Sequence, residues 1–136
     1  MQAVAEPPLT ILPNPRSVTE TVRGTPVAGE IERLATDILE HRFSLLRITT
    51  ATGPTIEWRR DYLNRISSDA AYFRRIPYLS VAHVGDHKVI WELNRHQHLV
   101  LLAQAFLLTG REEFFREIES QVESWLLQNP FVRGIN

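Results

Sequence analysis

The chain has 136 residues, which is enough for one small domain. Its formal net charge is −1, so no strongly basic surface argues for nucleic acid or an anionic membrane as a partner. It has no cysteine, which excludes disulfides and cysteine-based zinc sites, and no apolar run of about 18 residues that would span a membrane. Residues 1–16 lack the basic start and apolar core of a signal peptide. The compartment is left open: the chain as given is expected to be cytoplasmic, and a periplasmic or secreted location is the alternative if the natural chain begins further upstream.

Residues 1–24 are predicted to be an extended or disordered lead-in, because four prolines alternate there with threonine, serine and asparagine. A first amphipathic helix is expected over about residues 26–40. Thr25 is a good capping residue, and Pro26 suits the first helical turn. The apolar residues that follow recur at helical spacing. We interpret this helix as a packing element at the start of one domain, residues 25–136.

Residues 47–57 are expected to form a loop or a short strand. Trp58 is interpreted as an aromatic that packs this loop onto the domain, with a sugar-stacking platform as the alternative. The five arginines within residues 59–75 are interpreted as a solvated helix face, of which one or two are candidates to meet an acidic ligand. Residues 76–79 are expected to form an extended joiner.

The most informative stretch is residues 84–110, which begins polar and ends as an almost unbroken apolar run. The length of this run and its content of leucine and alanine favour one buried helix over a strand. The helix is expected to begin near Asp86, a suitable N-cap, and to stop at Gly110, which can take a left-handed conformation. What its polar beginning does is the central question of function.

Within that beginning, helical spacing predicts that Glu92 pairs with His96 and that Trp91 stacks on Arg95. His96 and His98 are two apart and point in different directions, so they cannot bind one metal from a regular helix. We expect neither a metal nor a cofactor. An acid–base pair that uses Glu92 or a histidine is one interpretation. A buried ion pair and hydrogen-bond network that fixes the start of the helix is the favoured one.

A second helix is expected over about residues 111–128, ended by Asn129 and Pro130. The connection to it is very short, so the two helices are predicted to form an antiparallel hairpin. The tail, residues 131–136, should then return to the polar beginning of the first helix, near residues 91–98. One apolar side of the hairpin has little left to cover it, from which we expect that the natural chain continues.

Four pieces of this region form a joint pattern: a Trp-Glu-Leu-Asn-Arg opening with Gln and His after it, a Leu-Thr-Gly turn, an Asn-Pro pair, and Gly-Ile-Asn. In this sequence they are Trp91–Arg95 with Gln97 and His98, Leu108–Gly110, Asn129 and Pro130, and Gly134–Asn136. The pattern, together with a weaker segment at residues 53–61, resembles the N-terminal part of the heparinase II/III family of polysaccharide lyases. The resemblance covers about residues 53–136.

The resemblance implies an all-α fold, a partial (α/α) toroid of helical hairpins behind the Pro-rich lead-in. In full-length members the remainder of the toroid and a β-sandwich domain follow, and this chain would need both. It also implies an acidic polysaccharide as partner, like heparin, heparan sulfate or alginate, cleaved at uronates by β-elimination. The Asn-Asn-His segment and the tyrosine associated with that chemistry lie further along the family's toroid, and that segment is absent here. We therefore expect an N-terminal fragment that is inactive alone.

No catalytic residue is carried over from the family. Five signature residues are predicted to bind substrate near the cleft end of the toroid: Trp91, Glu92, Arg95, His98 and Asn136. Arg95 is the candidate to bind a carboxylate through its two-pronged guanidinium, and Trp91 is the candidate stacking surface. The alternative is a non-catalytic helical module that binds carbohydrate or another protein. A glycoside hydrolase is disfavoured, because it needs two carboxylates across a cleft and only Glu92 is well placed.

Overall fold

The structure is a computed structural model that describes residues 14–135, so most of the predicted lead-in and Asn136 lie outside it. The described end of the lead-in is not extended. It forms helix α1 (Pro15–Val22), which corrects the prediction for this part of residues 1–24. Asn14 caps the helix by accepting a hydrogen bond from the Arg16 backbone N–H at 2.9 Å, and Pro15 lies in the first turn. Local cap chemistry therefore outweighs the high proline content.

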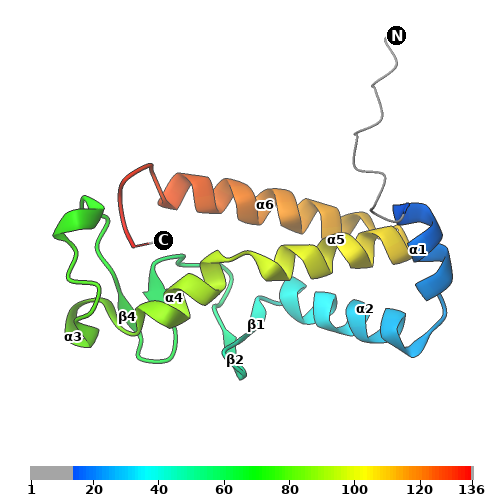
Figure 1. Ribbon diagram of the computed structural model, residues 1–136, viewed down its shortest axis with the longest axis horizontal. Helices are drawn as coiled ribbons and strands as arrows, with labels where there is room; N and C mark the ends of the chain where they lie inside the picture. Colours follow the sequence, from blue (N-terminus) through cyan, green and yellow to red (C-terminus); the bar gives the residue numbers. More distant parts are fainter. Residues whose placement is uncertain (1–13, 136) are drawn as a thin grey trace, which may run out of the picture.

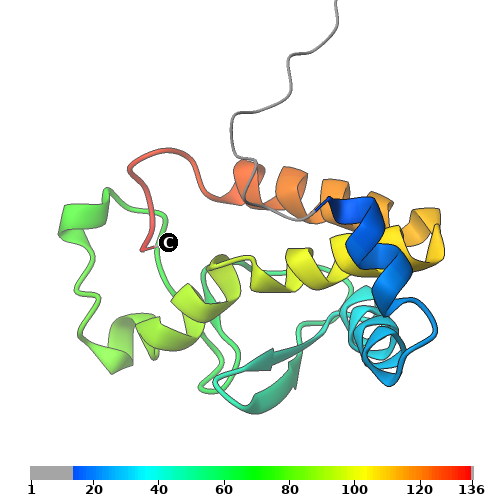
Figure 2. The same cartoon turned by 45° about the vertical axis from the view of Figure 1, so that its right-hand side comes forward.

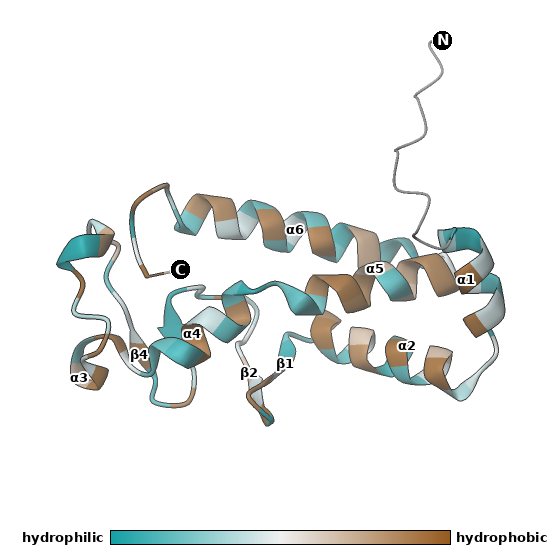
Figure 3. Cartoon of the chain, viewed as in Figure 1, coloured by the Kyte–Doolittle hydropathy of each residue, from teal (hydrophilic) through white to brown (hydrophobic). Residues whose placement is uncertain are grey.

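Three longer helices lie side by side: α2 (Pro26–Leu39), α5 (Gln97–Thr109) and α6 (Glu112–Gln128). Helix α5 lies between the other two and contacts both (Figure 1). Figure 3 shows hydrophobic residues along most of α5, as expected of a central helix, whereas α6 alternates between polar and apolar residues. The core between them is made by residues that are almost fully buried: Ala35, Ile38, Leu102, Ala105 and Phe114.

The predicted start of α2 and the predicted stop of α5 are confirmed. Thr25 caps α2 by accepting a hydrogen bond from the Ala28 backbone N–H. Gly110 ends α5 in a left-handed conformation with φ of +73°, and α6 begins two residues later. The α5–α6 pair is thus the predicted antiparallel hairpin. No helix within residues 14–135 is long and apolar enough to cross a membrane.

The prediction of a single helix from about residue 86 to residue 109 is wrong, because the helix is interrupted between α4 (His87–Asn94) and α5. His96 has a left-handed backbone with φ of +56°, which a continuous helix excludes. The Asn94 side chain holds the end of α4 by donating to the carbonyl oxygens of Trp58 and Ile90, both at 2.7 Å. Apolar residues on both sides of the break face one core, so the sequence pattern continues through it.

Two small antiparallel hairpins connect α2 to the second half of the chain, so the chain is mostly helical rather than purely so. Strand β1 (Arg42–Leu45) pairs with β2 (Ile48–Ala51), and β3 (Arg60–Asp61) pairs with β4 (Ile66–Ser67). β2 confirms the short strand expected within residues 47–57. The prediction that a helix presents the arginines of residues 59–75 is wrong, because β3, β4 and a short 3₁₀ turn η1 (Phe73–Arg75) occupy that segment.

Trp58 is fully buried, and its indole N–H donates to the Ser124 hydroxyl at 3.1 Å. This confirms that Trp58 packs the loop onto the domain and rules it out as a sugar-stacking platform. The neighbouring Asp61 is also fully buried. Burial tends to raise the pKa of its carboxyl, but hydrogen bonds from Asn64, from the backbone N–H of Asp86 and from other backbone groups outweigh this and hold the pKa below its usual range.

Asp61 thereby fixes the start of α4, after the short helix α3 (Val81–Val84) and Gly85. The Asp86 N–H donates to the Asp61 carboxylate at 2.6 Å, while the side chain of Asp86 caps α4 as predicted. Gly85 has φ of +74° and ψ of −160°, and a Cβ atom there would lie 2.5 Å from the Cβ of Asp61. Only glycine fits this position.

Candidate functional site

The C-terminal tail folds back from α6 and pairs with the segment that precedes η1. The Gly134 N–H donates to the Ala71 carbonyl at 3.0 Å, the Phe73 N–H donates to the Val132 carbonyl at 3.1 Å, and Tyr72 and Arg133 form an antiparallel bridge. Figures 1 and 2 both show this return of the chain.

Helix α4 forms the other side of this contact. The Trp91 indole N–H donates to the Ile135 carbonyl oxygen. Trp91 and the described part of the Gly-Ile-Asn tail therefore lie at the same end of the molecule, as predicted.

Between these parts lies a groove of about 1080 Å³, which we call the tail groove. Its lining comes from three segments: Phe73, Arg74, Ile76 and Tyr78; Trp91; and Trp125 with residues 129–135. Trp91 and Tyr78 are 38% and 45% exposed, and their ring centres lie 6.3 Å apart. His87 touches Trp91 edge-on, with ring centres 4.5 Å apart, and so supports the indole from the α4 side.

Among residues 14–135, the charged side chains that line the tail groove are all cationic. Arg74 and Arg133 line it, and no carboxylate side chain of residues 14–135 does. The guanidinium of Arg74 lies 5.8 Å from the ring centre of Phe73, and Arg133 donates to the Ala70 carbonyl at 3.4 Å. Aromatic faces beside unneutralised guanidinium groups can stack a sugar ring and bind its carboxylate or sulfate groups.

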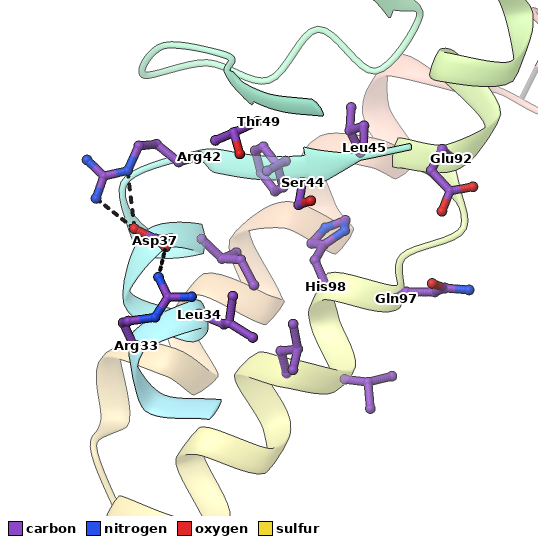
Figure 4. Close-up of a pocket in the computed structure, with 14 residues that line it drawn as sticks. Arg33, Leu34, Asp37, Arg42, Ser44, Leu45, Thr49, Glu92, Gln97 and His98 are labelled. Carbon is purple, nitrogen blue, oxygen red and sulfur yellow. Dashed lines mark hydrogen bonds and ion pairs between the residues drawn. The ribbon is translucent and has the colours of Figure 1, made fainter. Parts of the chain in front are cut away.

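Of the other predicted site residues, the three that the structure describes do not line this groove. Glu92 and His98 line a second cavity of about 640 Å³ between α2, the β1–β2 hairpin and the start of α5, which we call the hairpin pocket (Figure 4). Arg95 lines neither cavity; its side chain is 61% exposed, and its guanidinium lies 3.2 Å from the Glu92 carboxylate. Asn136 lies outside the described residues, so its predicted role stays a prediction.

The break before α5 also changes which residues pair. Glu92 forms its ion pair with Arg95, where pairing with His96 was predicted. Tyr78 and His87 are the ring partners of Trp91, where stacking on Arg95 was predicted. The Glu92–His96 prediction assumed helical geometry through His96, which the left-handed backbone of His96 removes. Arg95 keeps a helical backbone, but its side chain pairs with Glu92 rather than with Trp91.

The hydrogen-bond network of the favoured prediction is found at His98 and at Asn94, but its ion pair is not buried, because the Arg95 side chain that pairs with Glu92 is largely exposed. His98 Nε2 lies 2.8 Å from the Gln121 Oε1 atom, and burial lowers the pKa of His98 to about 4, so its ring is neutral at pH 7. The Asn94 Oδ1 atom accepts the Trp125 indole N–H at 2.7 Å. Asn94, which lies within the signature pattern, therefore has a structural role.

His96 is enclosed rather than presented to a ligand. Its ring lies between Trp58 and Trp125, with ring centres 5.4 Å and 5.2 Å away, and burial lowers its pKa. Its Nδ1 atom is buried and has no hydrogen-bond partner in the part of the chain that the structure describes. Within residues 14–135, no group of three or more histidine, aspartate or glutamate side chains is placed to hold a metal ion.

Arg74, Tyr78 and Arg133 are the groove residues that the sequence interpretation missed. Arg74 was assigned to a solvated helix face and Tyr78 to a joiner. The signal that could have found them was the cluster of exposed aromatic and arginine residues in residues 72–78, combined with the predicted return of the tail to this end.

Comparison with known proteins supports the resemblance of the sequence pattern. The family model described as heparinase II/III N-terminus matches residues 12–135, which is nearly the whole chain. No curated protein and no solved structure matches it. The chain therefore belongs to the heparinase II/III family, of which it carries the N-terminal region.

Proposed function

We propose that this chain is the N-terminal part of a lyase that cleaves uronate-containing acidic polysaccharides, and that its own contribution is to bind the polymer. In this proposal the α5–α6 hairpin, with α2 beside it, begins an (α/α) toroid. The family membership supports a polysaccharide lyase as the whole protein. The binding role depends on the tail groove.

The observation that carries the proposal is the combination of rings and charges in the tail groove. Trp91 and Tyr78 present partly exposed rings, against which the apolar face of a pyranose can pack. Arg74 and Arg133 lie beside them, and a guanidinium is the side chain best suited to bind a carboxylate or sulfate. A polymer with an acidic group on alternate or successive sugars presents both features to the groove at once.

We also propose that Arg95 binds a carboxylate of the polymer, which is the role predicted for it from the sequence. It lies one helical turn after Trp91 in the sequence, and its exposed guanidinium shares its charge with Glu92. Arg74 and Arg133 have no such carboxylate partner among residues 14–135, so we expect them to bind an acidic sugar more strongly than Arg95.

The test is a calorimetric titration of the purified chain with oligosaccharides derived from alginate and from heparin. Arg74→Ala should weaken binding at least about tenfold, because a hydrogen bond to a charged group contributes about 1.5–3 kcal/mol. Arg116→Ala is the matched control, since Arg116 is an exposed arginine on α6 that does not line the groove. Equal affinity for wild type and Arg74→Ala would remove the groove as the acidic-sugar site.

The chemistry of the proposed lyase is expected to depend on residues outside this chain. β-Elimination needs a group that neutralises the uronate carboxylate, a base for the C5 proton and an acid for the leaving oxygen. The Asn-Asn-His segment associated with these steps does not occur in the sequence. Incubation with uronate polymers should therefore give no ultraviolet absorbance from an unsaturated product. Product formation would contradict a role limited to binding.

A further inference from the structure

The hairpin pocket differs in chemistry from the tail groove. Its volume of about 640 Å³ is within the ~300–1,000 Å³ range typical of small-molecule sites. Figure 4 shows His98 extending from α5 toward Ser44 of β1, with Glu92 and Gln97 on one side and the Arg33–Asp37–Arg42 group on the other. Val100 and Leu101 supply an apolar wall.

The guanidinium groups of this pocket are already paired. Asp37 accepts hydrogen bonds from Arg33 at 2.9 Å and from Arg42 at 2.8 Å, and Glu30 and Glu40 pair with the same two arginines. The hydrogen bond from Arg42 is the largest cause that holds the pKa of Asp37 below its usual range, so this carboxylate stays ionised. With Glu92 as a second carboxylate in the lining, the pocket does not favour an anion.

A chain of hydrogen bonds from His98 to α6 determines which ring nitrogen of His98 carries the proton. Gln121 Nε2 lies 2.7 Å from a Glu117 carboxylate oxygen, which can only accept, so this end of the amide is its donor end. The Gln121 Oε1 atom must then accept from His98 Nε2 at 2.8 Å. His98 therefore carries its proton on Nε2 and has a lone pair on Nδ1.

This Nδ1 lone pair is available to a ligand. His98 Nδ1 has no hydrogen-bond partner within residues 14–135, and it is not enclosed as the Nδ1 atom of His96 is. Because burial keeps the ring neutral, Nδ1 offers an acceptor at pH 7. The Glu92 carboxylate is a second acceptor, and the Ser44 and Thr49 hydroxyls lie in the same lining. Such a pocket suits a ligand with several hydroxyl donors and no negative charge.

We propose that the hairpin pocket is a second saccharide site, selective for an uncharged sugar unit whose hydroxyls donate to His98 Nδ1 and Glu92 while its apolar face packs on Val100. This site differs from the tail groove in its position and in the charge of the sugar that it prefers. The inference does not require the tail groove to bind an acidic sugar, and either site can fail its test without the other.

The experiment uses the whole chain and two probes, methyl β-glucoside and methyl β-glucuronide, which differ only in the carboxylate at C6. NMR should show glucoside-dependent shifts of the His98 ring and the Val100 methyl groups, with at least about tenfold weaker binding of the glucuronide at these signals. The ¹⁵N shifts of the His98 ring at pH 7 should show a protonated Nε2 and an unprotonated Nδ1. A proton on Nδ1 would overturn the proposal, as would equal affinity for the two probes or no shifts at high millimolar glucoside.

A substitution that fills the pocket tests its location. Val100 is 57% exposed, so Val100→Trp should leave the fold intact and abolish the glucoside shifts. The matched control is Leu107→Trp, which adds an indole to the same helix at a position that is 51% exposed and outside the pocket. Retained glucoside binding in Val100→Trp, with the folded spectrum intact, would contradict the proposal. The Trp91 indole signal reports the tail groove independently in the same spectra.

Discussion

The indole N–H of Trp91 donates a hydrogen bond to the backbone carbonyl oxygen of Ile135, a residue 44 positions later in the chain. The contact is supported by a small apolar cluster, in which Ile135 packs with the buried residues Ile76, Val84 and Ile90. One side chain on α4 therefore both lines the tail groove and holds the tail that forms the opposite part of its lining. Sugar binding and order of the tail should depend on the same residue.

Trp91→Phe tests this link by keeping an aromatic ring and removing the donor. The Ile135 carbonyl then loses its partner, so the variant should be destabilised by about 1 kcal/mol. Amide hydrogen exchange at residues 134 and 135 should become faster, while exchange in α5 stays slow. Tyr78→Phe is the matched control, because Tyr78 contacts Trp91 through its ring alone. Unchanged exchange in the tail of Trp91→Phe would show that the hydrogen bond does not hold it.

Asn94→Ala should be more damaging than a typical surface substitution. The change removes two donated hydrogen bonds, to the Trp58 and Ile90 carbonyls, and leaves the Trp125 indole N–H without its acceptor. We expect a loss of about 2–3 kcal/mol in the free energy of unfolding, measured by urea denaturation. Asn94→Asp keeps the acceptor for Trp125 but places a carboxylate against two carbonyl oxygens, so it should not restore stability. Near-wild-type stability of either variant would argue against this role of Asn94.

Gly85→Ala should destabilise the chain by at least about 3 kcal/mol, or prevent folding. The new Cβ atom would lie 2.5 Å from the Asp61 Cβ and 2.7 Å from its carboxylate oxygen, in a backbone conformation that only glycine adopts readily. Gly53→Ala is the control: Gly53 also has positive φ, but a Cβ atom there meets nothing within 4 Å. It should cost about 1–2 kcal/mol. Similar thermal midpoints for the two variants would contradict a tight Asp61–Gly85 contact.

The depressed pKa of His98 predicts a pH dependence of stability. Its pKa falls from 6.5 to about 4 on folding, chiefly through burial, so between these values the unfolded chain binds a proton that the folded chain does not. The free energy of unfolding should therefore decrease as the pH is lowered from about 6.5 to 4, by at most about 3 kcal/mol from this residue. The lowered pKa of His96 acts in the same direction.

His98→Gln isolates this contribution, because glutamine can still donate to Gln121 but does not titrate. The plot of unfolding free energy against pH should become shallower between pH 4 and 6.5, while the loss of stability below pH 4, where Asp61 contributes through its own lowered pKa, should persist. Identical pH profiles for the variant and the wild type would show that His98 is not buried as a neutral ring.

Features set by local chemistry were predictable from the sequence. Thr25 and Pro26 start a helix through their own side chains, and Gly110 ends one through its own backbone. The short turn at Gly110 then implied an antiparallel hairpin, and the hairpin implied that the tail returns to Trp91. Each step follows from geometry within a few residues, so it needed no knowledge of distant contacts.

Features set by distant contacts were not predictable in this way. The break before α5 depends on Asn94 bonding to the carbonyl of Trp58, 36 residues earlier, and nothing in the spacing of apolar residues marks it. Arg74 and Tyr78 become groove residues only because the tail pairs with residues 71–73. The sequence therefore predicted the end of the molecule to which the tail returns, but assigned some groove residues to other surfaces.

We propose that the tail groove binds an acidic sugar polymer against Trp91. The most direct measurement is an NMR titration with a hexuronate tetrasaccharide, read at the indole N–H signals of the three tryptophans. A saturable shift is expected at Trp91, a smaller one at Trp125, which also lines the groove, and none at the buried Trp58. A Trp91 signal that does not move, whether the oligosaccharide binds elsewhere or does not bind at all, would contradict binding in the tail groove.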